Sequence, residues 1–154
     1  MEEMVHVHVE DMEAEHRSRH EGYEFYRRDL ISDEGNKLEA AHYEIPPGKA
    51  AFPYHYHIRN EESYYILSGK GKLKTPGGER IVTAGDFLFF PANEAGAHKL
   101  TNISDSENLV YLDFDSTSDV EIVFYPDSGK MGVWGRGINR LYRIGEDISY
   151  YDGE

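Results

Sequence analysis

Short runs of alternating apolar and polar residues, separated by turn residues, fill the chain from Tyr23 onward. The clearest turns are Pro46-Pro47-Gly48 and Gly77-Gly78, and the second fits a tight hairpin that needs positive φ. Nothing resembles a long amphipathic helix. Many short strands at close spacing are typical of a sandwich or barrel, so the sequence predicts an all-β fold. We expect strands at 24–28, 37–45, 51–57, 62–68, 71–75, 79–83, 86–90, 97–102, 108–114, 121–125 and 141–144.

The first 22 residues differ from the rest of the chain. Apolar and polar residues alternate from Val5 to Val9, which permits an edge strand, and a charged run then ends at His20. A length of 154 residues suits one domain with a sizeable core and is short for two. We therefore expect an N-terminal arm over residues 1–22 and one folded domain over residues 23–154.

The composition disfavours several classes of partner and site. The chain has 16 basic and 29 acidic side chains and a formal charge of −13, so nucleic acids and anionic membranes would be repelled. The absence of cysteine excludes disulfides, thiolate metal ligands and a cysteine nucleophile. No apolar run approaches the roughly 18 residues of a membrane-spanning helix, and the acidic N-terminus does not resemble a signal peptide. These features predict a cytoplasmic protein with a small-molecule partner.

The stretch from Gly48 to Gly69 carries the residues with the clearest chemistry. On a β-strand, residues i and i+2 point to the same face, so His55 and His57 would project side by side. The run that starts at Glu62 is predicted to return as the second strand of a hairpin and to bring its carboxylate towards the two imidazoles. His98, from a later strand, completes a candidate set of three histidines and one glutamate.

At these residues the chain resembles the cupin superfamily. The first cupin motif matches Gly48, His55-x-His57, Glu62 and Gly69, and the spacing to Gly69 selects Glu62 rather than Glu61. The second motif matches Gly85, Pro91, His98 and Asn102. The resemblance implies a double-stranded β-helix, that is, a jelly-roll barrel, with His55, His57, Glu62 and His98 as the metal ligands. The loops after Gly48 and after Pro91 are one and two residues longer than in the usual motifs.

Three imidazoles and a carboxylate suit one divalent transition metal ion, namely Fe, Mn, Ni, Co, Zn or Cu. An octahedral ion with four protein ligands keeps two positions for water or substrate, which is typical of a catalytic site. Such a cupin would act on a small oxygenated molecule, either as a dioxygenase or as an isomerase or lyase of a sugar-like substrate. The alternative is a non-catalytic cupin that binds a sugar or another small molecule through its metal.

Tyr64 is the candidate catalytic residue, because it shares a strand face with Glu62. Its phenol could donate a hydrogen bond to an oxygen bound to the metal, or give up a proton. The alternative is an ordinary barrel aromatic whose hydroxyl is paired elsewhere.

Two further features concern the later part of the domain. The run Phe87-Leu88-Phe89-Phe90 has no polar face, so we expect both of its faces to be covered and the protein to be a homodimer. The alternative is that the strands after Asn108 cover the run within one chain. Asp113, Asp115, Thr117 and Asp119 offer alternate oxygen atoms but lack the glycine and glutamate that an EF-hand loop needs, so no calcium loop is predicted.

Overall fold

The computed structural model describes residues 3–154, which form strands and two three-residue 3-10 turns, η1 (Val9–Asp11) and η2 (Glu94–Gly96). Neither turn is long or apolar enough to cross a membrane. The largest sheet contains, in order, β1 (Glu15–His20), β2 (Tyr23–Ile31), β3 (Leu38–Ile45), β10 (Leu109–Ser116), β5 (Glu62–Ser68) and β8 (Phe87–Phe90). A second contains β13 (Ile138–Arg143), β12 (Lys130–Gly135), β11 (Glu121–Tyr125) and β4 (Tyr56–His57). The third contains β7 (Gly78–Thr83), β6 (Lys70–Thr75) and β9 (Lys99–Asn102).

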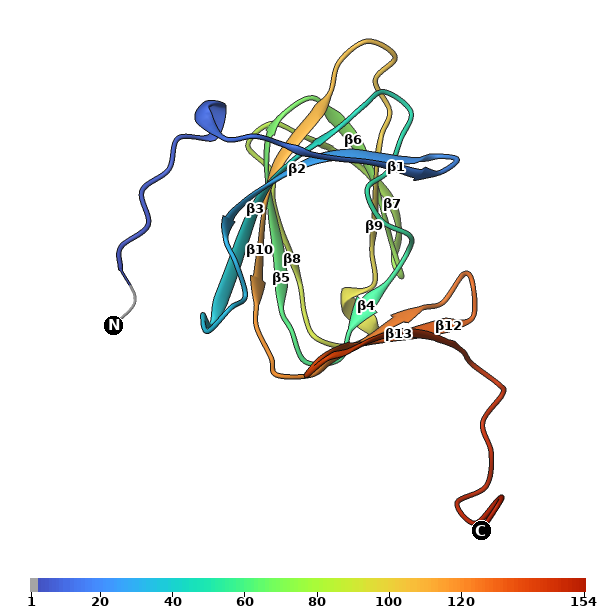
Figure 1. The fold of residues 1–154 in the computed structure, drawn as a ribbon. Coiled ribbons are helices and arrows are strands. Elements are labelled where there is room, and N and C mark those ends of the chain that lie inside the picture. Colours follow the sequence, from blue (N-terminus) through green and yellow to red (C-terminus); the bar gives the residue numbers. More distant parts are fainter. Residues whose placement is uncertain (1–2) are drawn as a thin grey trace.

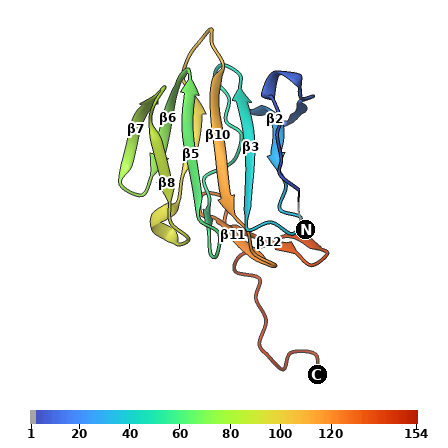
Figure 2. The ribbon, with the colours of Figure 1, turned by 90° about the vertical axis from the view of Figure 1, so that its left-hand side faces the viewer.

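The three sheets enclose a barrel. Viewed along its axis, the six-stranded sheet lies opposite the three-stranded sheet, and the four-stranded sheet lies across one side (Figure 1). The view from the side shows β8, β5, β10, β3 and β2 next to one another, with the C-terminal segment leading away from the barrel (Figure 2). All the strand pairs are antiparallel, and the arrangement is the predicted double-stranded β-helix.

The inner face of the large sheet changes from apolar to acidic along the strands. At one end Ile45, Ile66 and Leu109 are fully buried, and they pack with Leu73, Val82 and Leu100 from the three-stranded sheet. Tyr43, Tyr64 and Tyr111 follow along the same strands, and their rings are in contact with one another or with neighbouring aromatic rings. Burying each large apolar side chain contributes about 1.5–3 kcal/mol, so this end supplies the core. The opposite end is left for polar groups.

Gly69, the last residue of the first cupin motif, has a structural reason to be glycine. It joins β5 to β6 at a φ of +90°, in the left-handed region that favours glycine. A Cβ atom at this position would also lie 2.5 Å from the carbonyl oxygen of Asn108. The turn therefore brings β6 close to the start of β10.

Some strand boundaries differ from the sequence prediction. Residues 5–9 form no strand, and the N-terminal edge strand is β1, whose side chains are all polar and almost all exposed, so it lacks an alternating pattern. β12 was not predicted either. The strand expected over 51–57 is regular only at β4, since Pro53 has no N–H to donate to a neighbouring strand.

The apolar run of β8 is buried on one face only. Phe90 is buried against the core, whereas Phe87 and Phe89 are 64% and 54% exposed. The alternative in which strands after Asn108 cover both faces is therefore wrong for the described chain. That a second copy of the chain covers the exposed face of β8 stays a prediction.

Candidate metal centre

Backbone pairing brings His55 and His98 together. The two residues form an isolated antiparallel bridge, in which each backbone N–H donates to the other's carbonyl oxygen at 3.1 and 3.0 Å. Their ring centroids lie 4.6 Å apart. His57 follows two residues after His55 on the same face, and its ring centroid lies 5.2 Å from that of His55. The first and second histidine motifs thus meet through the main chain.

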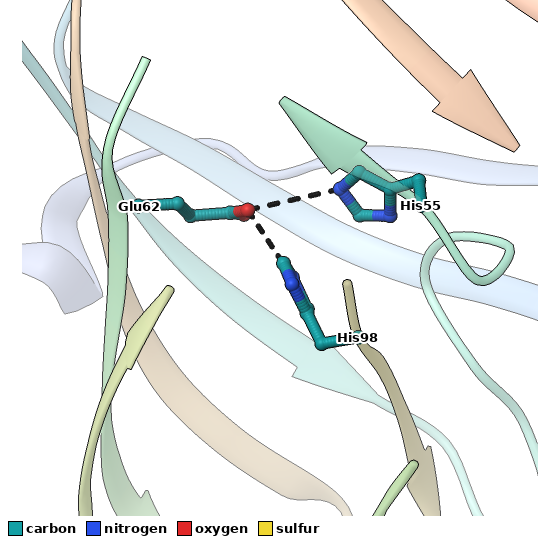
Figure 3. Close-up of side chains that lie close together, drawn as sticks. All are labelled: His55, Glu62 and His98. Carbon is teal, nitrogen blue, oxygen red and sulfur yellow. Dashed lines mark ion pairs between the residues drawn. The ribbon is translucent and has the colours of Figure 1, made fainter. Parts of the chain in front are cut away.

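Glu62 lies among the three imidazoles. Its Oε2 atom is 3.7, 3.3 and 3.1 Å from the Nε2 atoms of His55, His57 and His98. Figure 3 shows the carboxylate directed between His55 and His98. Ligand atoms that bind an ion at about 2.1 Å and at right angles are about 3.0 Å apart, which is close to the distances from His57 and His98. The ligand atoms of His55, Glu62 and His98 all lie within 4.8 Å of one another, whereas His57 falls into a second group with Glu62 and Asp115. That all four bind one ion stays a prediction.

The hydrogen bonds of two histidines fix which nitrogen faces the centre. Nδ1 of His55 lies 2.8 Å from the carbonyl oxygen of Pro53, and Nδ1 of His98 lies 2.8 Å from that of Gly96. Each Nδ1–H donates to a carbonyl oxygen, which leaves the Nε2 lone pair free for a metal. Burial lowers the pKa of His55, which favours the neutral form that a metal requires.

The carboxylate of Glu62 behaves as a metal ligand would. Burial alone would raise its pKa, but the three imidazoles hold the pKa of Glu62 well below its usual value. Oε2 is buried and accepts no hydrogen bond from any residue in the described range 3–154. A buried anionic oxygen without a hydrogen-bond donor, surrounded by imidazole nitrogens, fits a divalent cation.

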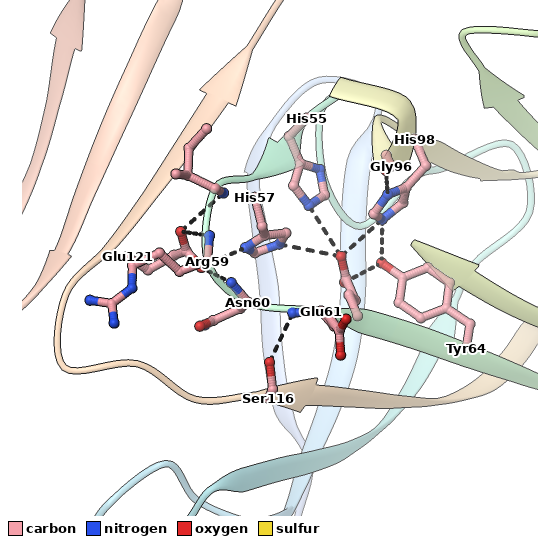
Figure 4. A network of polar contacts seen from close by, with 12 residues as sticks. His55, His57, Arg59, Asn60, Glu61, Tyr64, Gly96, His98, Ser116 and Glu121 are labelled. Atoms are coloured by element: carbon pink, nitrogen blue, oxygen red, sulfur yellow. Dashed lines mark hydrogen bonds and ion pairs between the residues drawn. The ribbon is translucent and has the colours of Figure 1, made fainter. Parts of the chain in front are cut away.

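Glu121 is a residue of the centre that the sequence analysis missed. Its side-chain oxygens accept hydrogen bonds from the backbone N–H groups of Ile58, Arg59 and Asn60, and this fixes the turn after His57 (Figure 4). Oε2 also lies 3.7 Å from Nδ1 of His57. Burial opposes a charge on His57, but Glu121 and Glu62 together raise the pKa of His57 to about 10. A metal must therefore displace a proton from His57.

Tyr64 is fully buried beside Glu62. Its hydroxyl donates a hydrogen bond to Oε1 of Glu62 at 2.7 Å and lies 3.1 Å from Nε2 of His98 (Figure 4). Tyr64 does not line the large cavity that opens onto the histidines. The geometry favours a role in holding Glu62, and the catalytic role of Tyr64 stays a prediction.

Asn102, the last residue of the second motif, has a structural role. Its side-chain amide donates to the carbonyl oxygens of Ile45 and Glu107 at 2.8 Å, and its side-chain oxygen accepts from the N–H of Ser104 at 2.9 Å. These bonds hold the turn between β9 and β10 closed.

A cavity of about 610 Å³ opens onto the centre. Its walls include His55, His57 and Glu62, together with aromatic residues and several charged side chains. The charged residues that sequence reasoning missed are Arg17, Arg27, Asp33, Glu39, Asp113, Asp115 and Glu121. Asp113 and Asp115 lie in strand β10 rather than in a calcium-binding loop, and their even spacing from Tyr111 was the signal that could have placed them inside the barrel.

Comparisons with known proteins agree with this architecture. The family model for the cupin domain matches residues 41–115. A candidate sugar phosphate isomerase from Acidithiobacillus ferrooxidans has a solved structure with a TM-score of 0.81 and 28% identity, covering 92% of this chain and 91% of that one. A sugar phosphate isomerase of the cupin superfamily from Silicibacter pomeroyi, at 20% identity, shares the fold with a TM-score of 0.78 over 96% of this chain and 98% of its own.

A more distant likeness covers a smaller part of the chain. A predicted oxalate decarboxylase from Thermotoga maritima is 27% identical, with a TM-score of 0.64, over 75% of this chain and all of that one. No curated protein matches the sequence. From the matched family model, the barrel and the buried histidine and glutamate residues, we conclude that residues 41–115 form a cupin domain.

Proposed function

We propose that this protein is a metal-dependent isomerase or lyase of a small, sugar-like hydroxy-carbonyl compound. The observation that carries the proposal is that His55, His57 and Glu62, which form the candidate ligand set with His98, line a cavity of about 610 Å³ that also contains several carboxyl groups. A divalent ion in this set would polarise the carbonyl and hydroxyl oxygens of a substrate.

The lining of the cavity favours a sugar-like hydroxy-carbonyl substrate. The many acidic groups disfavour a dianion such as oxalate, and they offer partners for the hydroxyl groups of a sugar-like compound. The Acidithiobacillus ferrooxidans relative supports a sugar-like substrate. A dioxygenase is the second enzyme class that the metal ligands would allow.

Asp115 is the residue that we assign to proton transfer. One of its oxygens lies within 4.8 Å of ligand atoms of both His57 and Glu62, so it lies beside the reacting end of a bound substrate. In its ionised form it can take the proton from the carbon next to a carbonyl and return it to the former carbonyl carbon, while the hydroxyl proton passes to the former carbonyl oxygen, and this converts an aldose into its ketose without net oxidation. Burial, with the charge of Glu62, raises the pKa of Asp115 to about 9, so the fraction of Asp115 in this basic form increases towards that pH.

The proposal is tested with protein reloaded separately with Mn, Fe(II), Co, Ni or Zn. Each form is incubated in D₂O with neutral aldoses and ketoses and with their phosphate esters, and NMR follows interconversion and deuterium uptake. We expect turnover with at least one metal, and Asp115→Asn should lower it by about 10²–10⁴ without loss of metal, as for a lost acid–base group. Asp33→Asn is the control, because Asp33 is exposed at the cavity wall.

Two results would contradict the proposal. Binding of sugars without interconversion or deuterium uptake would favour the non-catalytic cupin. Uptake of dioxygen by the Fe(II) form, together with oxidation of the added compound, would favour a dioxygenase.

A further inference from the structure

Three carboxylates lie in one row on the inner face of the large sheet. Asp115 of β10 is the direct cross-strand partner of Glu39 on β3 and of Glu62 on β5. Directly opposed residues share a face, and like charges in such positions are destabilising. Asp113 follows two residues before Asp115, so it joins the same wall one row deeper. All four carboxylates line the cavity, and we call Glu39, Asp113 and Asp115 the acidic wall.

A buried oxygen of the acidic wall lacks a partner. The Asp113 side chain is 5% exposed, and its Oδ1 atom accepts no hydrogen bond from any residue of the described chain. Oδ1 of Asp115 is also buried and accepts no hydrogen bond from any described residue. Leaving such a group unpaired costs about 1–3 kcal/mol, so the wall is built to accept hydrogen bonds from something in the cavity.

Two arginines line the cavity, and the charge of Arg27 acts on Glu39 and Asp113 although its direct ion pair is with Asp29. The guanidinium of Arg27 lies 5.6 Å from the centre of the Tyr43 ring, and its Nε atom is 2.5 Å from Oδ1 of Asp29. Arg17 is paired with Glu15 at 2.7 Å. The cavity lining therefore contains two guanidinium groups, each paired with another carboxylate, and six carboxyl groups, namely Asp33, Glu39, Glu62, Asp113, Asp115 and Glu121. Burial and the neighbouring acidic groups raise the pKa values of Glu39, Asp113 and Asp115 and favour their neutral forms. A phosphate or carboxylate group on a ligand would thus meet acidic groups and no arginine free to pair with it.

We infer that the acidic wall is a subsite for the hydroxyl groups of a neutral, unphosphorylated polyhydroxylated substrate. A carboxylate accepts two hydrogen bonds side by side, and adjacent hydroxyls of a sugar chain offer two donors at matching spacing. Glu39 and Asp113 flank Asp115, so the hydroxyls that they hold would keep the reacting carbon beside it. The choice of substrate class rests on the proposed function, whereas the hydroxyl-binding wall rests on the contacts alone.

Binding is measured on zinc-loaded protein, with glucose, xylitol and glucose 6-phosphate as probes. Chemical shifts in NMR titrations give the Kd of each probe, and the metal content and circular dichroism of every variant show whether it is folded and loaded. Asp113→Asn and Glu39→Gln should each weaken binding of glucose and xylitol tenfold or more. Asp105→Asn, at an exposed position outside the cavity lining, is the control and should leave both Kd values within twofold. Glucose 6-phosphate should bind at least tenfold more weakly than glucose.

Three outcomes would overturn the inference. Unchanged Kd values in both variants would remove the acidic wall from ligand binding, and tighter binding of the phosphate ester would contradict the neutral substrate. A second equivalent of Mn²⁺ or Ca²⁺ that is lost in Asp113→Asn would make the wall a cation site instead.

Hydroxyl binding by the acidic wall and isomerase activity can be tested separately. If sugars are interconverted while the two variants keep the wild-type KM, the subsite is wrong and the isomerase stands. If the polyols bind through Glu39 and Asp113 but no sugar is turned over, the subsite stands and the isomerase is wrong.

Discussion

His55 and His98 exchange two backbone hydrogen bonds, of 3.1 and 3.0 Å, although they come from different motifs of the chain. Their positions are therefore set by main-chain pairing and do not depend on the imidazoles or on a bound ion. The barrel itself thus positions two histidines of the candidate metal centre.

Replacing a ligand histidine should remove the metal and keep the fold. His57→Ala should weaken metal binding by at least about 10², more than the roughly 10–100-fold effect of an outer residue. The barrel should stay folded, because its core lies at the other end of the strands. Elemental analysis and circular dichroism provide the measurements. His42→Ala is the matched control, since His42 is also buried but is not one of the candidate ligands. Loss of folding in His57→Ala alone would contradict a pre-formed site.

Glu121 should support the metal from outside the ligand set. Glu121→Gln replaces a carboxylate by a neutral amide. It therefore weakens the hydrogen bonds from the backbone N–H groups of residues 58–60 and the attraction to His57. We expect metal affinity to fall about 10–100-fold, and the free energy of unfolding to fall by about 1–3 kcal/mol. Competition with a chelator and denaturant titration measure the two effects. Glu79→Gln, at an exposed position, should change neither; equal behaviour of the two variants would remove Glu121 from the site.

Tyr64→Phe separates the two roles of the phenol. Since the hydroxyl donates to Oε1 of Glu62, its loss should weaken metal binding by about tenfold or more, as for other groups that orient ligands. Turnover measured at saturating metal should then stay within severalfold of wild type. Tyr65→Phe is the control, because Tyr65 points to the outside of the same strand. If instead turnover falls about 10²-fold at unchanged metal affinity, Tyr64 is the proton donor.

The metal-free protein should lose stability as the pH rises. His57 has a pKa of about 10 in the folded chain and an ordinary value of 6.5, so its contribution is complete below about pH 6.5 and is lost as the pH approaches 10. The raised pKa of Asp115, about 9 against an ordinary 3.8, acts in the same direction from about pH 4 to 9. Denaturant titration of metal-free protein at several pH values measures this loss.

Variants identify the groups responsible for the pH dependence. Asp115→Asn should raise the free energy of unfolding at pH 8 by about 1 kcal/mol or more, since one pKa unit corresponds to about 1.4 kcal/mol, and the gain should shrink towards pH 4. His57→Gln should flatten the curve between about pH 6.5 and 10. A gain in Asp115→Asn that is independent of pH would show that Asp115 is not the titrating group.

We propose that the exposed face of β5 and β8 forms a homodimer. Tyr65 and Phe87 are cross-strand partners, and together with Leu67 and Phe89 they form an exposed uncharged surface on a chain with a formal charge of −13. A second copy presents the same uncharged surface, so the two can meet without opposing charges. Sedimentation at micromolar concentration should give twice the mass of the chain. Phe89→Glu should give a monomer, whereas Leu141→Glu, at an exposed position on β13, should not; a monomeric wild type would refute the proposal.

The local order of residues was enough to predict most strands. Alternation and turn residues determine strands whatever lies around them, and the two-residue spacing of His55 and His57 places both imidazoles on one face. The motif spacing distinguished Glu62 from Glu61. Exposed β1, which contains only polar side chains, carries no such pattern and was missed.

The tertiary structure alone decided what surrounds the ligands. Glu121 reaches the turn after His57 only because β11 pairs with β4, and the row of Glu39, Asp115 and Glu62 exists only in the register of β3, β10 and β5. Register between segments separated by more than fifty residues depends on how the whole barrel closes, and a shift of one residue would turn each of these carboxylates to the other face.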